Sequence, residues 1–86
     1  MSVTFTDEAL TEYISWQTGD KKTLLRINEL IKSIQRDGFM QGIGKPEVLK
    51  YRKAYSRRID SANRLVYIGD SNQNIVILSC KGHYDD

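Results

Sequence analysis

The side chains that could do chemistry lie mainly in one short stretch of this 86-residue chain. Glu47 is a carboxylate among basic residues, and the single histidine is His83. The strands of a predicted hairpin between them carry three arginines, Arg57, Arg58 and Arg64. Cleavage of RNA without a metal needs a base for the 2′-hydroxyl, an acid for the leaving 5′-oxygen and cations beside the crowded phosphorus. A carboxylate, a histidine and arginines can fill these roles, although spacing in the sequence does not show that they meet.

Positive charge is concentrated in the same stretch. Residues 45–64 hold seven basic and two acidic side chains, a net charge of +5, whereas residues 1–44 carry −1 and residues 65–86 carry −2. Clustered basic charge on a small domain is typical of proteins that bind polyanions. A solvated basic loop is the alternative that charge alone leaves open.

Composition limits the class of protein. With 40% hydrophobic and 28% charged residues, we expect a soluble globular protein with one domain, residues 1–86. No apolar run approaches the roughly 20 residues that span a bilayer, and no leader is visible, so we expect a cytoplasmic protein with no membrane contact. The single cysteine, Cys80, is expected to be a buried apolar residue. One cysteine and one histidine do not make a zinc site, and we expect neither metal nor cofactor.

The first half of the chain is predicted to form a strand and two antiparallel helices. "SVTF" alternates enough for a short strand, and Thr6 can cap a helix that begins with two carboxylates. The apolar stripe of this helix is Leu10, Tyr13, Ile14 and Gln17, with Ala9 and Trp16 beside it. Asp20 can cap a second helix, whose apolar face is Leu24, Ile27, Leu30, Ile31 and Ile34.

The second half is predicted to supply an antiparallel sheet. "AYSRRI", "NRLVYIGD" and "NIVILSC" are rich in β-branched and aromatic residues and are separated by turn-forming clusters. Successive hairpins make a three-strand meander, and the N-terminal strand is expected to pair with it. "GFMQGIGKPEVLKYRK" is predicted to be a long surface loop, with an optional short turn at residues 47–50. The fold class is therefore α+β, with both helices on one face of a single sheet.

Five fragments carry a resemblance to a known family. "RINELIKSIQRDGF", "GKPEVLK", "SRRI", "NRLVY" and the final "HY" resemble the YoeB toxins of the RelE superfamily, in order and over essentially the whole chain. The resemblance implies the RelE-like microbial RNase fold and the toxin of a bacterial type II toxin–antitoxin pair. Such toxins enter the ribosomal A site and cleave the mRNA codon there. An acidic YefM-like antitoxin, the ribosome and mRNA are the implied partners, with a homodimer as an option.

The resemblance also implies roles for individual residues. Glu47 would be the general base and His83 the general acid, while Arg64 and one or both arginines of "SRRI" would stabilise the phosphate. Tyr84 would orient or stack a base. The implied catalytic set is Glu47, Arg58, Arg64, His83 and Tyr84, and the implied RNA-binding set is Lys45, Lys50 and Arg57.

The two neighbouring arginines point to opposite faces if the stretch is a strand, so at most one of them readily faces a common site. A two-residue turn at residues 61–62 would put Arg57 on the face of Arg64. A bulged turn would put Arg58 there instead. The family match favours Arg58, which is the prediction that we adopt.

Two other functions remain open. A ParE-like toxin that poisons DNA gyrase would share the scaffold without needing the Glu-Arg-His set. A catalytically impaired protein of the same fold could still bind RNA or an antitoxin. The altered connector "YRKAY" and the added Asp85 and Asp86 are the departures from the family pattern that keep the second alternative open.

Overall fold

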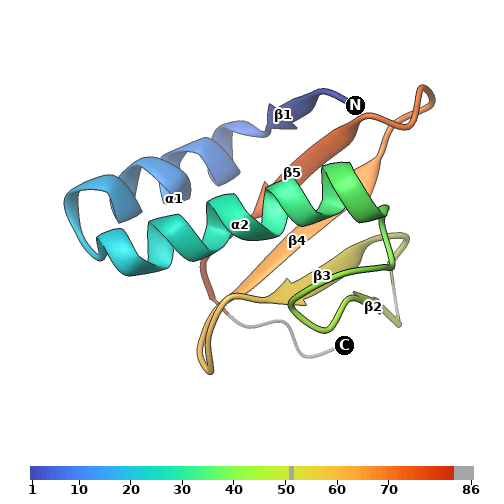
Figure 1. Ribbon diagram of the computed structural model, residues 1–86. Coiled ribbons are helices and arrows are strands. Elements are labelled where there is room, and N and C mark those ends of the chain that lie inside the picture. Colours follow the sequence, from blue (N-terminus) through green and yellow to red (C-terminus); the bar gives the residue numbers. More distant parts are fainter. Residues whose placement is uncertain (51, 83–86) are drawn as a thin grey trace.

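Seven elements make up the structure, a computed structural model that describes residues 1–50 and 52–82 (Figure 1). The helices are α1 (Asp7–Thr18) and α2 (Lys21–Asp37). The strands are β1 (Val3–Phe5), β2 (Glu47–Val48), β3 (Tyr55–Arg58), β4 (Arg64–Gly69) and β5 (Ile75–Ser79). All five strands form one sheet in the order β1-β5-β4-β3-β2, and Figure 1 shows both helices on the same face of it.

The predicted meander is confirmed, because β3, β4 and β5 are successive antiparallel neighbours. The N-terminal strand also pairs with it, as predicted. It does so in parallel, with Val3 opposite Ile75 and the Thr6 N–H donating to the Ile77 carbonyl (3.1 Å). The sheet is therefore mixed, and its antiparallel part carries the residues singled out above.

The loop prediction for residues 47–48 was wrong, because these residues form β2. Glu47 lies opposite Ser56 and Val48 opposite Tyr55, and the Leu49 N–H donates to the Ala54 carbonyl (2.8 Å). An outer strand leaves backbone donors and acceptors without partners, and β2 pairs those of β3. This short strand fixes Glu47 to the sheet.

Both predicted helix caps are present. The Thr6 hydroxyl accepts a hydrogen bond from the Ala9 N–H (3.1 Å) at the start of α1. The Asp20 carboxylate accepts from the N–H groups of Lys22 (3.0 Å) and Thr23 (3.3 Å) at the start of α2. Such caps pair backbone donors that have no partner inside the helix.

Only part of the apolar stripe predicted for α1 faces the core. Leu10 and Ile14 are 44% and 50% exposed, whereas Ala9 is fully buried and Tyr13 and Trp16 pack against the core. The small Ala9 side chain allows a close approach to the end of β5. The Cys80 thiol donates to the Ala9 carbonyl there (3.7 Å).

The main core lies between the helices and the sheet. It is built around fully buried side chains of α2, β4 and β5: Ile27, Leu30, Ile34, Leu65, Tyr67, Ile75 and Ile77. A smaller apolar cluster is formed by Leu49, Ala54 and Val66, with Ile68 and Leu78 beside it. None of the helices in the described part of the chain has the length and apolar character needed to cross a membrane.

Candidate active site

Four polar side chains share one face of the sheet. Arg58 lies opposite Arg64, and Ser56 lies opposite both Val66 and Glu47 in the neighbouring strands. Residues opposite one another, and alternate residues along a strand, point to the same face. Leu65 and Tyr67 point into the helix-covered core. Glu47, Ser56, Arg58 and Arg64 therefore point to the other face.

The β3–β4 turn decides which arginine faces the site. Ile59 and Asp60 both donate their N–H to the Asn63 carbonyl (3.0 and 3.2 Å), which closes a loop one residue longer than the simple turn. The Asp60 carboxylate accepts hydrogen bonds from the N–H groups of Ala62 and Asn63 (both 2.8 Å) and holds this loop. Since a one-residue change of register exchanges the faces, Arg58 is placed beside Arg64. The predicted facing of Arg58 is confirmed.

The Arg64 guanidinium is buried but only partly satisfied. Its Nε donates to the Ser56 hydroxyl (3.0 Å), and Ser56 is itself fully buried. Its Nη2 lies 3.7 Å from Oε2 of Glu47, a distance too long for a hydrogen bond. Nη2 is buried and has no hydrogen-bond partner among the described residues. A buried guanidinium nitrogen in this state is a natural binding point for an oxyanion.

The carboxylate of Glu47 is accessible, unlike the guanidinium beside it. Its side chain is 62% exposed, against 10% for Arg64. Glu47 can therefore meet a solvent-borne hydroxyl while its neighbour stays in a low-dielectric setting. Arg58, Lys45 and Lys50 are also exposed, so the basic side chains predicted to surround this carboxylate lie at the surface.

Arg57 is in the core and does not face the site. It is fully buried, with its Nε donating to the Tyr67 hydroxyl (2.8 Å) and its Nη1 to the Ser33 hydroxyl (3.0 Å). It also donates to backbone carbonyls of the segment after α2, at Gly38 (2.8 Å), Phe39 (3.5 Å), Gln41 (2.6 Å) and Ile43 (2.9 Å). Each nitrogen of the buried guanidinium already donates to a group within the protein. We therefore withdraw Arg57 from the RNA-binding set. It anchors the segment that leads to Glu47.

His83 and Tyr84 lie outside the described residues, as do Asp85 and Asp86. The residue before His83, however, is placed beside Arg64. The Gly82 carbonyl accepts from the Arg64 N–H (3.0 Å), and the Gly82 N–H donates to Oδ1 of Asn63 (2.8 Å). The described part of the chain thus ends beside the backbone of Arg64.

Cys80 is buried, as predicted. Burial raises the pKa of its thiol to about 12, with a smaller contribution from the negative charge of Glu12. The thiol therefore stays protonated at neutral pH and is not a nucleophile. In the described residues, no group of three or more metal-ligating side chains of the His, Cys, Asp or Glu type comes together.

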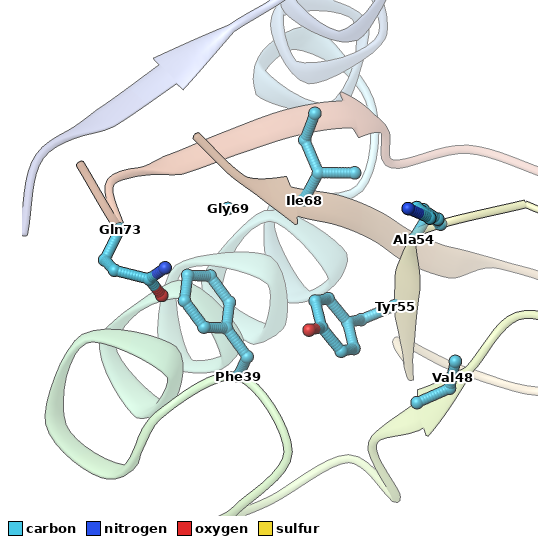
Figure 2. Close-up of a pocket in the computed structure, with 8 residues that line it drawn as sticks. Phe39, Val48, Ala54, Tyr55, Ile68, Gly69 and Gln73 are labelled. Atoms are coloured by element: carbon cyan, nitrogen blue, oxygen red, sulfur yellow. The ribbon is translucent and has the colours of Figure 1, made fainter. Parts of the chain in front are cut away.

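A cavity of about 320 Å³ lies at the other end of β3 and β4. Figure 2 shows the rings of Phe39 and Tyr55 side by side at this cavity, with Gly69 near Phe39. The two rings are stacked with centroids 5.5 Å apart, and Tyr55 stacks in turn on Tyr67 (5.6 Å). A larger residue at Gly69 would collide with the Phe39 ring, because a Cβ there would lie 2.8 Å from it. The cavity was not predicted.

Comparison with known proteins adds the family. Residues 5–84 match the family described as the YoeB-like toxin of bacterial type II toxin–antitoxin systems. The chain belongs to this family. It is 48% identical to the toxin YoeB of Synechocystis sp., over 98% of both chains.

Solved structures of YoeB toxins have the same fold. The YoeB dimer from Staphylococcus aureus matches with a TM-score of 0.91 and 48% identity, over 98% of both chains. The YoeB–YefM complex from the same organism matches with a TM-score of 0.89 and 49% identity, again over 98% of both chains. The predicted α+β class and RelE-like fold are confirmed by these matches.

Sequence reasoning missed two polar residues of this YoeB-like toxin. Ser56 holds Nε of Arg64, and Asn63 holds the backbone of Gly82. Each is next to an arginine in the sequence, which is the only signal that could have drawn attention to it. Neither partner could be named without the strand register.

Proposed function

We propose that this YoeB-like toxin is a metal-independent endoribonuclease that cleaves mRNA codons in the ribosomal A site and so inhibits translation. The supporting observation is the pair formed by Glu47 and Arg64, an exposed carboxylate 3.7 Å from a buried guanidinium, with Arg58 beside them. We further propose that residues 1–86 act as one toxin domain.

The proposed reaction is an internal attack by the ribose. Glu47 takes the proton of the 2′-hydroxyl, and the 2′-oxygen forms a bond to the adjacent phosphorus. The bond from phosphorus to the 5′-oxygen breaks, and His83 gives that oxygen a proton. The products are a cyclic phosphate at the 3′ end of one fragment and a 5′-hydroxyl on the other. The reaction needs neither a metal nor a water molecule in this step.

The arginines would stabilise the charge that develops on the phosphate oxygens. Nη2 of Arg64 is buried without a hydrogen-bond partner among the described residues, and a phosphate oxygen would supply one. Ser56 holds Nε of the same guanidinium, which fixes its plane before the substrate arrives. Arg58, opposite Arg64 and exposed, would contact a second oxygen.

The basic surface would bind the nucleic acid. Lys45 and Lys50 are exposed and flank Glu47 in the sequence, and we propose that they contact phosphates of the mRNA near the cleaved bond. Tyr84 would orient or stack a base of the codon. Because the ribosome and mRNA are cytoplasmic, we propose that the toxin acts in the cytoplasm.

The same surface would bind an acidic YefM-like antitoxin. A solved structure of the S. aureus relative, which is 49% identical to this chain, is a YoeB–YefM complex. The net charge of +5 in residues 45–64 suits a disordered acidic segment that folds on binding. The S. aureus YoeB dimer supports a homodimer as a further state of this chain.

The decisive test is cleavage of mRNA in a reconstituted translation system, with the fragment ends mapped within codons. Wild type should cut in A-site codons, and Glu47→Gln and His83→Gln should each cut at least a hundredfold more slowly. Glu29→Gln, an exposed glutamate of α2, is the matched control and should cut at the wild-type rate. Each tenfold loss corresponds to about 1.4 kcal/mol of transition-state stabilisation. Ribosome binding without cleavage by the wild type would refute the proposal.

A further inference from the structure

Residues 80–82 connect β5 to His83 without belonging to a strand, and side chains hold them in place. The Glu12 carboxylate accepts from the Cys80 N–H (2.7 Å), and the Trp16 indole N–H donates to the Cys80 carbonyl (3.0 Å). Both residues come from α1. This end of the segment is therefore fastened to the helix rather than to the sheet.

The other end of the segment is fastened to the β3–β4 turn. Two successive residues, Asn63 of the turn and Arg64 at the start of β4, hold the N–H and the carbonyl of Gly82. Oδ1 of Asn63 accepts from the Gly82 N–H (2.8 Å), and the Arg64 N–H donates to the Gly82 carbonyl (3.0 Å). The backbone before His83 is thus tied to the residue that carries the candidate phosphate-binding guanidinium.

The Asn63 side chain is itself held in one orientation. Its Nδ2 donates to both carboxylate oxygens of Asp60 (3.1 and 3.2 Å), an acceptor that only the NH₂ end of the amide can meet. Oδ1 is therefore left to face Gly82. The same Asp60 carboxylate sets the length of the turn. One network thus places Arg58 beside Arg64 and also holds Gly82.

Gly82 has a backbone conformation that suits this contact. Its φ is +92°, in the region that glycine adopts without strain. A Cβ at this position would meet no atom within 4 Å, so the requirement for glycine comes from the backbone and not from crowding. The backbone conformation at Gly82 is therefore one that favours glycine.

We propose that Asn63 is a positioning residue that fixes the chain immediately before His83 against Arg64. The inference rests on the proposed function, in which His83 and Arg64 act on the same phosphate. Successive Cα atoms are about 3.8 Å apart, so a fixed Gly82 limits where residue 83 begins. Proton transfer needs donor and acceptor within about 3 Å, and a misplacement of about 1 Å can cost a hundredfold in rate.

The test compares Asn63→Ala with Asn72→Ala, an exposed asparagine in the β4–β5 turn. Three quantities are measured: kcat and KM for mRNA cleavage, the exchange rate of the Gly82 amide hydrogen, and the Hε1 NMR signal of the single histidine. In Asn63→Ala we expect kcat to fall at least tenfold with KM within about twofold. We also expect the Gly82 amide to exchange at least about tenfold faster and the Hε1 signal to move. Asn72→Ala should match the wild type in all three.

A second variant keeps the test decisive if Asn63→Ala does not fold. Gly82→Ala strains the backbone at the same point without touching Asn63, and it should lower kcat in the same way. An unchanged kcat in a folded Asn63→Ala or Gly82→Ala variant would overturn the positioning role, as would a Gly82 amide exchange rate equal to that of the wild type in Asn63→Ala. Full activity in His83→Gln would overturn the proposed function itself, and the positioning role with it.

Discussion

Oε2 of Glu47 lies 3.7 Å from Nη2 of Arg64, although the two residues belong to strands that are not neighbours. β3 lies between β2 and β4, and its Ser56 is opposite Glu47 on one side and accepts from Nε of Arg64 on the other. Three strands therefore contribute one residue each to a polar group on one face of the sheet, with Arg64 diagonal to Ser56. A carboxylate and a guanidinium held together in this way need little rearrangement before the proposed reaction.

Arg64→Lys should abolish most of the proposed cleavage activity. Lysine keeps the charge but has no planar fork, and it cannot donate to Ser56 and reach a phosphate oxygen at the same time. We expect the cleavage rate to fall at least a hundredfold, about 2.7 kcal/mol, in a reconstituted translation system. Arg26→Lys on α2 is the matched control, because its exposed ion pair with Glu29 (3.8 Å) can be kept by lysine. Near-normal cleavage by Arg64→Lys would contradict the assigned role.

Arg57→Met should destabilise the fold. The substitution leaves the carbonyls of Gly38, Gln41 and Ile43 without their buried donor, and each unsatisfied group costs about 1–3 kcal/mol. We expect the free energy of unfolding in urea to fall by about 3 kcal/mol, partly offset if water reaches the carbonyls.

Arg58→Met is the matched control for this measurement, because Arg58 is the exposed neighbour on the opposite face. It should change the free energy of unfolding by less than about 0.5 kcal/mol. Equal effects of the two substitutions would show that the guanidinium of Arg57 does not hold the segment after α2.

The sequence predicted the helices, the meander and the caps because each depends on local signals. Hydrophobic period, turn residues and capping side chains act within a few positions of one another. The stripe predicted for α1 was only partly right, with Tyr13 on the core and Leu10 and Ile14 exposed, because helical spacing does not show which side of the helix a neighbour covers. The small Ala9 side chain is fully buried, and its carbonyl contacts Cys80 after the end of β5.

The site was harder to predict because it depends on whether the β3–β4 turn has two residues or three. "DSAN" is compatible with a two-residue and a three-residue loop, and the two place opposite arginines beside Arg64. Family resemblance favoured Arg58, but the physical cause is the set of hydrogen bonds around Asp60 and Asn63. β2 was missed for a different reason, because a strand of only two exposed residues has no alternating apolar pattern that would mark it in the sequence.

Stability should fall in acid, in part because of the Asp20 cap. Hydrogen bonds from the Thr23 side chain and backbone hold the pKa of Asp20 below its ordinary value of 3.8. A carboxyl whose pKa is lower in the folded state contributes stability above its unfolded pKa, and that contribution is lost as the pH falls through the folded value. An asparagine at this position would still cap the helix but would not titrate.

We therefore expect the unfolding temperature of the wild type to drop more steeply below about pH 4 than that of Asp20→Asn. The two variants are compared by thermal unfolding between pH 7 and pH 2. Lowered pKa values at Asp37, Asp60 and Asp70 contribute to both curves and cancel in the difference. Parallel curves would contradict the assigned contribution of Asp20.

The Cys80 thiol should be unreactive in the folded protein. Burial raises its pKa to about 12, and the reactive thiolate is correspondingly scarce at pH 8. A thiol-reactive disulfide reagent should modify native Cys80 at least about a hundredfold more slowly than the denatured chain. Ser71→Cys supplies the matched reference, because it puts a second thiol in the exposed β4–β5 turn. That variant should show one fast and one slow reaction, and a fast reaction at Cys80 in the folded wild type would mean that the segment before His83 opens readily.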